Sequence, residues 1–265
     1  MKSELNLQKL KTEFRDGQEI LYFMANESSF INLNEFLDQS LSLEFTGQIN
    51  CIHCDRTTKK SFGQGFCFPC FRSLARCDMC LVRPETCHFQ QGTCREPEWG
   101  IENCMQAHTV YLANSSGLKV GITRGENPLG RWMDQGAVAA IPLATVNRRI
   151  DAGRVEVALK QIVSDKTNWR KMLKGDVDEV DLCQEREKMR QYMPDDVTYQ
   201  WSKAPAVNIR YPIVEHPKKV TSFNFDKNPL VEGTLKGIKG QYLIFDTGVI
   251  NIRKFAGYRI SFRQN

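Results

Sequence analysis

Short alternations of apolar and polar residues, separated by Asn and Gly, characterise both ends of the chain. In the first fifty residues the clearest runs are 20–23 and 41–45, and such runs between turn-forming residues are typical of β-strands. Near the other end, residues 242–246 and 249–253 form similar runs in a stretch that glycine interrupts repeatedly. This spacing predicts a β-rich C-terminal domain, a small curled sheet or barrel.

The centre of the chain begins with the same strand pattern. Residues 108–113 and 118–123 predict a hairpin, because the intervening Asn-Ser-Ser-Gly is a turn-forming sequence. Further on, residues 176–193 predict an acidic surface helix that ends at Pro194.

Between these two elements the spacing becomes helical. After Gly153, apolar residues recur at intervals of three and four, as on one face of an amphipathic helix. The residues on this face are Val155, Leu159, Ile162 and Val163. Strand and helix patterns together predict an α+β fold.

No apolar run approaches the roughly 18 residues that a membrane helix needs. The first thirty residues carry charged groups throughout and lack an apolar signal core. We therefore expect no membrane partner, no secretion and a cytoplasmic location.

Charge is distributed unevenly along the chain, although the net charge is only +5. Residues 105–175 hold 11 basic and 5 acidic groups, and residues 201–265 hold 11 and 4. Residues 176–200, between these blocks, hold 3 basic and 8 acidic groups. Two basic blocks separated by an acidic one favour a polyanionic partner such as nucleic acid. Solvated lysine-rich faces are the alternative explanation.

Nine of the ten cysteines fall between Cys51 and Cys104, and six of them form three CxxC pairs. Two thiolates in a CxxC turn can bind one metal ion, whereas a disulfide across two residues is strained. Without an export signal, zinc is favoured over disulfides. The lone Cys183 on the acidic helix is interpreted as a plain thiol.

The first two pairs, Cys51-x-x-Cys54 and Cys67-x-x-Cys70, have the spacing of a zinc ribbon, in which two turns complete one tetrahedron. Such a closed site is structural, because no position remains for water or substrate. We therefore expect at least one structural Zn²⁺ here.

A second cluster follows, and its ligands cannot be ranked securely from spacing alone. Cys77 and Cys80 form the third pair and are the preferred ligands. The remaining candidates are, in order of preference, Cys94, Cys87 and Cys104. The histidines His53 and His88, each beside a cysteine, are interpreted as non-ligands, and His108 as a core residue that begins a strand.

These patterns predict an N-terminal β-rich segment, a zinc-ribbon-like cysteine module, a small α/β core, an acidic helix or linker, and the C-terminal β domain. The corresponding residues are 1–50, 51–104, 105–175, 176–194 and 195–265.

The hairpin in the α/β core resembles the paired strands of the GIY-YIG nuclease superfamily, through Thr109-Val110-Tyr111 and Lys119-Val120-Gly121. The resemblance continues with Arg131, Glu156 and Asn168. It implies that Tyr111 helps to activate water, that Arg131 stabilises the phosphate, and that Glu156 holds a divalent metal such as Mg²⁺. A cation on the phosphate and a carboxylate for a hard metal are also what phosphodiester cleavage needs.

The hairpin departs from the superfamily pattern at three positions. Thr109 stands where glycine is usual, Lys119 where the second tyrosine belongs, and Gln135 near a common histidine. Lys119 either replaces part of the tyrosine's role as a further catalytic residue, or the site is inactive. Glu156 with Lys160 also has the spacing of an ordinary helix ion pair.

The chain as a whole is similar to an uncharacterised bacterial family of unknown function that combines these segments. The marks of that family are Cys77-Asp78-x-Cys80, Pro84-Glu85-x-Cys87-His88, Gly92-Thr93-Cys94-Arg95 and the segment from Gly237 to Tyr242.

The preferred hypothesis is a zinc-containing protein that binds nucleic acid and has a GIY-YIG-like phosphodiesterase core for RNA or structured DNA. Candidate phosphate contacts are Lys119, Arg124, Arg131, Arg148 and Arg149. The alternatives are a non-catalytic nucleic-acid or protein scaffold, and an RNA-processing or modification factor with other chemistry.

Overall fold

The structure is a computed structural model that describes residues 2–26 and 29–265. Its contacts divide the chain into two compact units. Unit 1 comprises Met1–Phe71, Leu173–Gly175 and Arg210–Asn265, and unit 2 comprises Arg72–Met172 and Asp176–Ile209. The two ends of the chain, expected as separate domains, therefore belong to one unit, and the cysteine module is divided between the units after Phe71.

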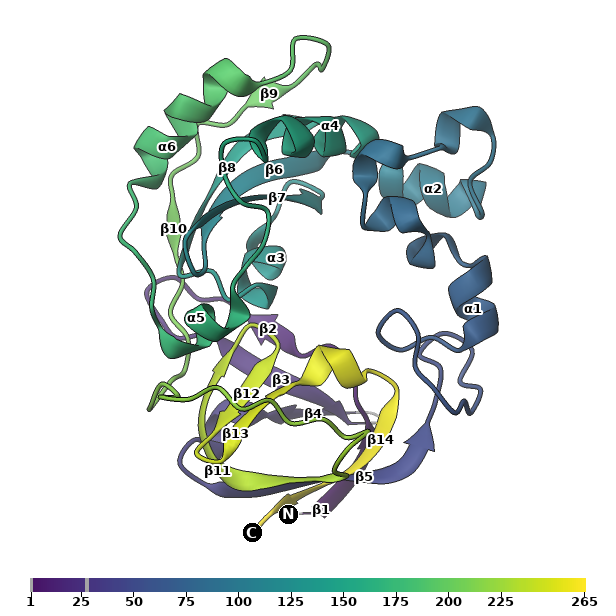
Figure 1. Ribbon diagram of the computed structural model, residues 1–265, viewed down its shortest axis with the longest axis vertical. Helices are drawn as coiled ribbons and strands as arrows, with labels where there is room; N and C mark the ends of the chain where they lie inside the picture. Colours follow the sequence, from purple (N-terminus) through teal and green to yellow (C-terminus); the bar gives the residue numbers. More distant parts are fainter. Residues whose placement is uncertain (1, 27–28) are drawn as a thin grey trace. The chain divides into compact units, whose positions relative to one another are not determined.

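A six-stranded antiparallel sheet is the main element of unit 1 (Figure 1). Its strands lie in the order β1 (Lys2–Asn6), β14 (Tyr258–Gln264), β5 (Ser40–Ile49), β11 (Leu230–Lys239), β12 (Tyr242–Phe245) and β13 (Gly248–Asn251). The C-terminal strand β14 pairs with both β1 and β5. Within the described residues the edge strands β1 and β13 do not pair, so the sheet is open and the expected barrel is not closed.

Alternation of buried and outward-facing residues fixes the register of this sheet. In β14, Ile260 and Phe262 are fully buried, and Phe262 lies opposite the buried Leu43 of β5. Arg259 and Arg263 point outward and form ion pairs with carboxylates. A slip of one residue would expose this apolar face, and each buried side chain of this size contributes about 1.5–3 kcal/mol.

A second antiparallel sheet in unit 1 follows the order β2 (Lys11–Glu13), β3 (Leu21–Asn26) and β4 (Ser29–Asn32). Tyr22 and Met24 on β3 are buried, as the alternation in this part of the sequence predicts. Unit 1 also contains two short 3-10 helices, η1 (Leu33–Phe36), before the cysteine turns, and η7 (Ile252–Phe255), near the C-terminus.

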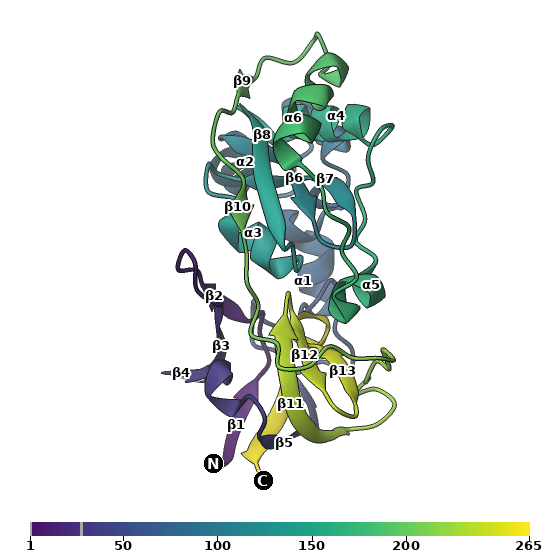
Figure 2. The same cartoon turned by 90° about the vertical axis from the view of Figure 1, so that its left-hand side faces the viewer.

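Unit 2 contains the hairpin of β6 (His108–Asn114) and β7 (Leu118–Arg124), so the predicted hairpin is confirmed. Its turn includes Gly117 with φ of 137°, a conformation that side chains rarely adopt. Strand β8 (Ala139–Val146) packs against β6 and is paired with the short strands β9 (Gln200–Trp201) and β10 (Val207–Asn208) (Figure 2).

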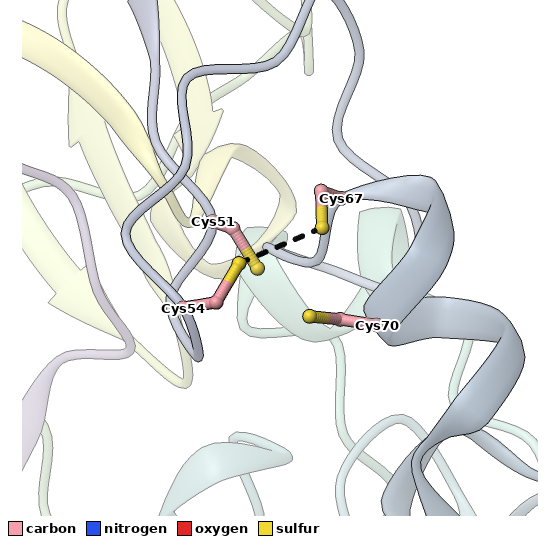
Figure 3. Close-up of side chains that lie close together, drawn as sticks. All are labelled: Cys51, Cys54, Cys67 and Cys70. Atoms are coloured by element: carbon pink, nitrogen blue, oxygen red, sulfur yellow. Dashed lines mark hydrogen bonds between the residues drawn. The ribbon is translucent and has the colours of Figure 1, made fainter.

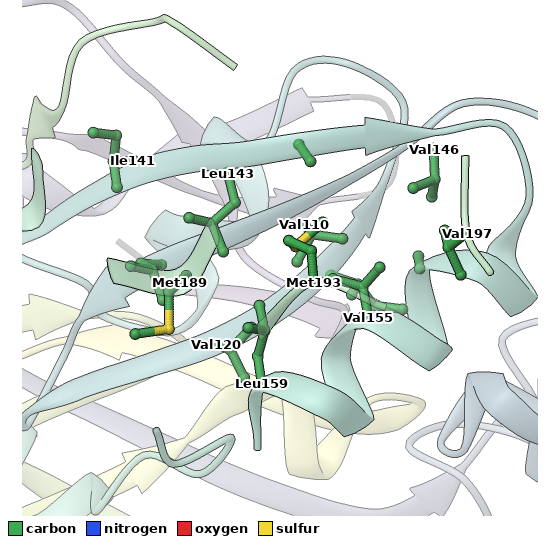
Figure 4. Packing of buried hydrophobic residues seen from close by; sticks show 14 of the residues in the cluster. Val110, Val120, Ile141, Leu143, Val146, Val155, Leu159, Met189, Met193 and Val197 are labelled. Atoms are coloured by element: carbon green, nitrogen blue, oxygen red, sulfur yellow. The ribbon is translucent and has the colours of Figure 1, made fainter. Parts of the chain in front are cut away.

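Helices α4 (Arg149–Leu159) and α6 (Leu182–Met189) pack on these strands and contribute to the core of unit 2 (Figure 4). Unit 2 also contains α2 (Pro97–Cys104), α3 (Leu129–Asp134) and, across the boundary with unit 1, α5 (Trp169–Lys174). Val155 and Leu159 of α4 and Met189 of α6 pack against Val110 of β6 and Leu143 of β8.

The 3-10 helices of unit 2 lie mostly in the cysteine-rich part. They are η2 (Ala75–Cys77), η3 (Met79–Leu81), η4 (Pro84–Thr86), η5 (Phe89–Gln91) and, after α6, η6 (Arg190–Tyr192). α4 packs closely on η4, because a Cβ atom at Gly153 would lie only 2.4 Å from the backbone nitrogen of Glu85.

Two predicted helices are shorter than their patterns indicate. Helix α4 ends at Leu159, and Ile162 is 46% exposed, because the chain turns so that the Ser164 carbonyl accepts a hydrogen bond from the Val120 N–H at 2.8 Å. The acidic helix begins only after Asp181, whose carboxylate caps the first turn. In the part of the chain that the structure describes, no helix has the length and apolarity to cross a membrane.

Candidate metal centre

Four cysteines from two CxxC turns converge in unit 1 (Figure 3). The sulfurs of Cys51, Cys54, Cys67 and Cys70 all lie within 4.8 Å of one another, and those of Cys54 and Cys67 are 3.7 Å apart. Four sulfurs at tetrahedral corners, each about 2.3 Å from zinc, lie about 3.8 Å apart. The predicted cluster is confirmed, and its geometry suits one structural zinc ion.

The first turn is closed by unusual backbone conformations. The Asp55 N–H donates to the Cys51 carbonyl at 2.9 Å, with Asp55 at φ of 56°. Across from it, the Gly65 carbonyl accepts from the Ile52 N–H at 2.9 Å. A Cβ atom at Gly65, where φ is 128°, would lie 2.8 Å from the Ile52 side chain. Glycine is therefore required where the two turns approach each other.

The second turn opens α1 (Phe68–Ser73), in which the Phe71 N–H donates to the Cys67 carbonyl at 2.9 Å. Aromatic rings pack beside it: Phe62 lies 5.8 Å from Phe71 and 5.4 Å from Phe68, measured between ring centroids. Phe68 is exposed and the other two rings are half-buried, so the three phenylalanines form a surface cluster beside the second turn, not a core.

The crowding of four thiols perturbs their ionisation. Burial opposes the thiolate of Cys51, but backbone N–H groups of Cys67, Cys54 and His53 outweigh it and lower the pKa of Cys51 to about 6. Burial, and then hydrogen bonds with the other three sulfurs, raise the pKa of Cys70 above its ordinary value. A zinc ion favours all four thiolates, so its binding would release protons.

In unit 2, the residues named by the nuclease resemblance share one neighbourhood. Tyr111 on β6 lies opposite Gly121 on β7, and Lys119 is two residues before Gly121 and hence on the same face of the hairpin. The charges of Arg131, from α3, and Glu156, from α4, both act on Tyr111 and on Lys119. Four residues distant in the sequence are therefore brought together.

The Tyr111 side chain is completely buried in this cluster. Its hydroxyl donates to Gln135 Oε1 at 2.9 Å, and its ring lies 5.9 Å from that of Trp132. Burial raises the pKa of Tyr111 to about 12, although the positive charge of Arg131 opposes this shift. The phenol is therefore a hydrogen-bonding group, not a base, at neutral pH.

Lys119 is only 3% exposed, and its ammonium group donates to Thr167 Oγ1 at 3.3 Å. Burial, and next the charge of Arg131, lower the pKa of Lys119 to about 8. Burial raises the pKa of Glu156, and the nearby ammonium of Lys160 partly offsets this effect. Lys160 lies 3.6 Å from Glu156, so the ordinary helix ion pair that the spacing predicts is present.

Three candidate phosphate contacts have partners within the chain. Arg148 forms a bidentate ion pair with the Asp151 carboxylate, with N···O distances of 2.7 and 2.8 Å. Arg149 is buried and donates to the Leu81 carbonyl at 2.8 Å. Arg124 donates to the Asn103 carbonyl at 3.0 Å. These three guanidinium groups make intramolecular contacts, so a phosphate footprint would depend on other side chains.

The remaining cysteines of the module lie in unit 2. There, Asp78, Cys80 and His88 bring their ligand atoms within 4.8 Å of one another. Asp78 was missed from the sequence, although its place inside Cys77-Asp78-x-Cys80 is a signal, because an aspartate before a short helix caps its first turn. His108 is fully buried, as expected for a core histidine, and Cys183 is exposed on α6.

Fold and site together define a mixed α and β protein with a four-cysteine cluster whose geometry suits a structural zinc ion. The family model described as a protein of unknown function, DUF2797, matches residues 38–260, so the chain belongs to this family. This match confirms the similarity to an uncharacterised family. No curated protein and no solved structure matches the chain.

Proposed function

We propose that this protein binds RNA or structured DNA, and that Tyr111, Lys119, Arg131 and Glu156 form a phosphodiester-cleaving site. The observation that supports the proposal is their convergence: the charges of Arg131 and Glu156 act on both Tyr111 and Lys119. In this proposal the four-cysteine centre is a folding device, because four thiolates leave zinc no open position.

The chemistry assigns each side chain a role. Arg131 binds the non-bridging phosphate oxygens and stabilises the charge that develops on them. Lys119, with its pKa lowered to about 8, accepts the proton of the attacking water better than Tyr111, whose pKa is raised to about 12. Tyr111, which is completely buried and donates to Gln135, is a positioning residue in this proposal, and the leaving oxygen takes a proton from solvent.

Glu156 fits the role of a metal ligand, because its side chain, which is only 13% exposed, lies beside this cluster. A Mg²⁺ ion there would add positive charge near the phosphate and would keep most of its own waters, so that one carboxylate suffices. Zinc bound by thiolates would not interfere, because Mg²⁺ prefers oxygen ligands.

Cleavage with Mg²⁺ of single-stranded RNA, structured RNA and branched DNA tests the catalytic part of the proposal. We expect the Glu156→Gln variant to lose activity by about 100-fold. The exposed Glu126 of the same unit offers a matched control, and Glu126→Gln should keep full activity. Equal rates for wild type and Glu156→Gln would remove the catalytic role.

Binding is tested separately by fluorescence anisotropy with labelled RNA and branched DNA. A footprint made of phosphate contacts should weaken by at least about tenfold between about 50 and 200 mM salt. A flat salt dependence would contradict the proposed footprint even if affinity were high.

The second candidate is a non-catalytic nucleic-acid-binding scaffold. The contacts that favour it are the Glu156 pair with Lys160 and the Lys160 pair with Asp165 at 3.0 Å, since both ion pairs stabilise a helix end without any chemistry. Salt-dependent binding without cleavage, unchanged in Glu156→Gln, would support this role.

A further inference from the structure

The cysteine-rich part of unit 2, residues 75–104, surrounds a small cavity. Its volume is about 10 Å³, which is room for about one water-sized sphere. Four thiols from different elements line it: Cys80 from η3, Cys87 after η4, Cys94 after η5, and Cys104 at the end of α2. We propose that these four cysteines bind a second zinc ion, independently of any role in nucleic-acid binding.

This part of the chain needs such a support because it has almost no core. Within residues 75–104 the buried apolar side chains are Ala75, Cys80, Pro84 and Cys104. Its regular structure consists of 3-10 turns of three residues and the eight-residue α2. Helices this short are not stable by themselves. Metal binding supplies folding free energy where apolar burial cannot.

Helix α2 is shaped to bring two of the thiols to the same side. A Cβ atom at Gly100 would lie 3.2 Å from the Cys94 sulfur and 2.8 Å from the Phe89 ring, so the helix backbone lies directly against Cys94. Cys104 follows Gly100 by four residues and therefore projects from the same helix face. Glycine at position 100 allows Cys94 and Cys104 to face one cavity.

A buried cation offsets part of the charge of a zinc ion with four thiolates. Such a complex carries two negative charges in excess, which require compensation away from solvent. The buried guanidinium of Arg149 interacts electrostatically with both Cys80 and Cys104. Its hydrogen bond to the Leu81 carbonyl holds it beside η3. Arg149, considered as a phosphate contact from the sequence, is thereby assigned to the metal site.

Asp78 and His88 also line the cavity, and we assign them supporting roles. The Asp78 carboxylate accepts from Arg95 at 2.7 Å and from the Cys80 N–H at 3.4 Å. His88 Nδ1 lies 2.8 Å from Thr93 Oγ1, and its Nε2 lies 3.6 Å from the Asp78 carboxylate. Their ligand atoms lie within 4.8 Å of the Cys80 sulfur, but both side chains are engaged with neighbours, and thiolates are the ligands that a soft site selects for zinc.

Cys77 is excluded by the same geometry, although its CxxC spacing with Cys80 predicts a ligand. Among the described residues that line the cavity, Cys80 is present and Cys77 is not. Cys77 ends η2, and the extended Asp78 directs the next turn toward the cavity. The pair Cys77 and Cys80 therefore offers a matched comparison within one motif.

The proposal is tested by the zinc content of the full-length reduced protein, measured by elemental mass spectrometry. We expect two zinc ions per chain in the wild type, and one in Cys80→Ser and Cys104→Ser. The controls Cys77→Ser and His88→Ala should retain two. One zinc in the wild type would overturn the proposal, and loss of a zinc in His88→Ala with two retained in Cys87→Ser would overturn the ligand set.

A measurement on the wild type alone covers the case in which a variant does not fold. Alkylation of the zinc-loaded protein, with mapping of each modified cysteine, should leave Cys80, Cys87, Cys94 and Cys104 protected while the exposed Cys183 reacts at once. A chelator should remove this protection. Reaction of Cys87 or Cys94 as fast as Cys183 in the zinc-loaded protein would contradict the site.

Discussion

The side chain of Tyr111 occupies the space that a side chain at Gly121 would need. The two residues are paired across the hairpin, and a Cβ atom at position 121 would lie 2.6 Å from the Tyr111 hydroxyl oxygen and 2.7 Å from the ring carbon that bears it. Glycine at 121 thus determines where the phenol lies. This contact links a backbone feature of β7 to the cluster proposed to act on phosphate.

We expect Gly121→Ala to lower the free energy of unfolding by about 1–3 kcal/mol, because the buried tyrosine ring must move within a packed core. Urea unfolding measures this change. Gly130, at the exposed start of α3, is the control: a Cβ atom there meets nothing within 4 Å, so Gly130→Ala should be neutral or slightly stabilising. Equal stabilities for the two alanine variants would show that Tyr111 adapts freely.

Sequence spacing was sufficient to predict the hairpin and the first cysteine cluster, because both depend on residues close together in the chain. Cys51 and Cys70 are joined by two short turns whose geometry the CxxC spacing already restricts. The fold of unit 1 could not be derived in this way. The pairing of β5 with β14 joins Leu43 to Phe262, and strand patterns carry no information on which distant strand is the partner.

The second cluster shows a different limit of sequence spacing. Cys77 and Cys80 are equally good ligands by the CxxC rule, yet only Cys80 faces the cavity, because Asp78 turns the chain between them. Likewise, the burial of Arg149 depends on α4 packing against η4, which no local pattern in either segment predicts.

Loss of one ligand should disable the four-cysteine centre of unit 1. We expect Cys70→Ser to lose one zinc ion per chain and at least about 2 kcal/mol of unfolding free energy, because three thiolates no longer close the tetrahedron. Zinc content and thermal melting check this. The exposed Cys183 offers the control, since Cys183→Ser should change neither. Full zinc content in Cys70→Ser would remove Cys70 from the ligand set.

Acid should destabilise the protein partly through His108. Burial lowers the pKa of His108 to about 4, below the 6.5 of an unfolded histidine. The unfolded state therefore binds the proton first, and stability is lost as the pH falls from about 6.5 toward 4. This difference of about 2.5 units corresponds to about 3 kcal/mol.

The comparison of wild type with His108→Leu isolates this contribution, because release of zinc in acid affects both proteins. Between pH 6.5 and 4 the variant should lose about 3 kcal/mol less of its unfolding free energy than the wild type does, as measured by urea titrations at each pH. Parallel pH profiles would mean that His108 takes up its proton over the same pH range in the folded protein as in the unfolded chain.

Lys119 should show that the proposed catalytic cluster costs stability. Burial lowers the pKa of Lys119 to about 8 from an unfolded value of 10.5, so the folded protein disfavours the charged ammonium. The destabilisation is complete below pH 8 and disappears as the pH rises through 10.5, where both states are neutral. Replacement by Met, an unbranched apolar side chain, should raise the unfolding free energy at pH 7 by about 1–3 kcal/mol, with the lower value reflecting the lost attraction to Glu156. The advantage should shrink at pH 10.

Lys188→Met, at an exposed lysine that pairs with Glu185 at 2.6 Å, should give no such gain. If Lys119→Met is less stable than wild type at pH 7, the ammonium is favourably bound in the folded state, and Lys119 then lacks the lowered pKa that its proposed role as a proton acceptor requires.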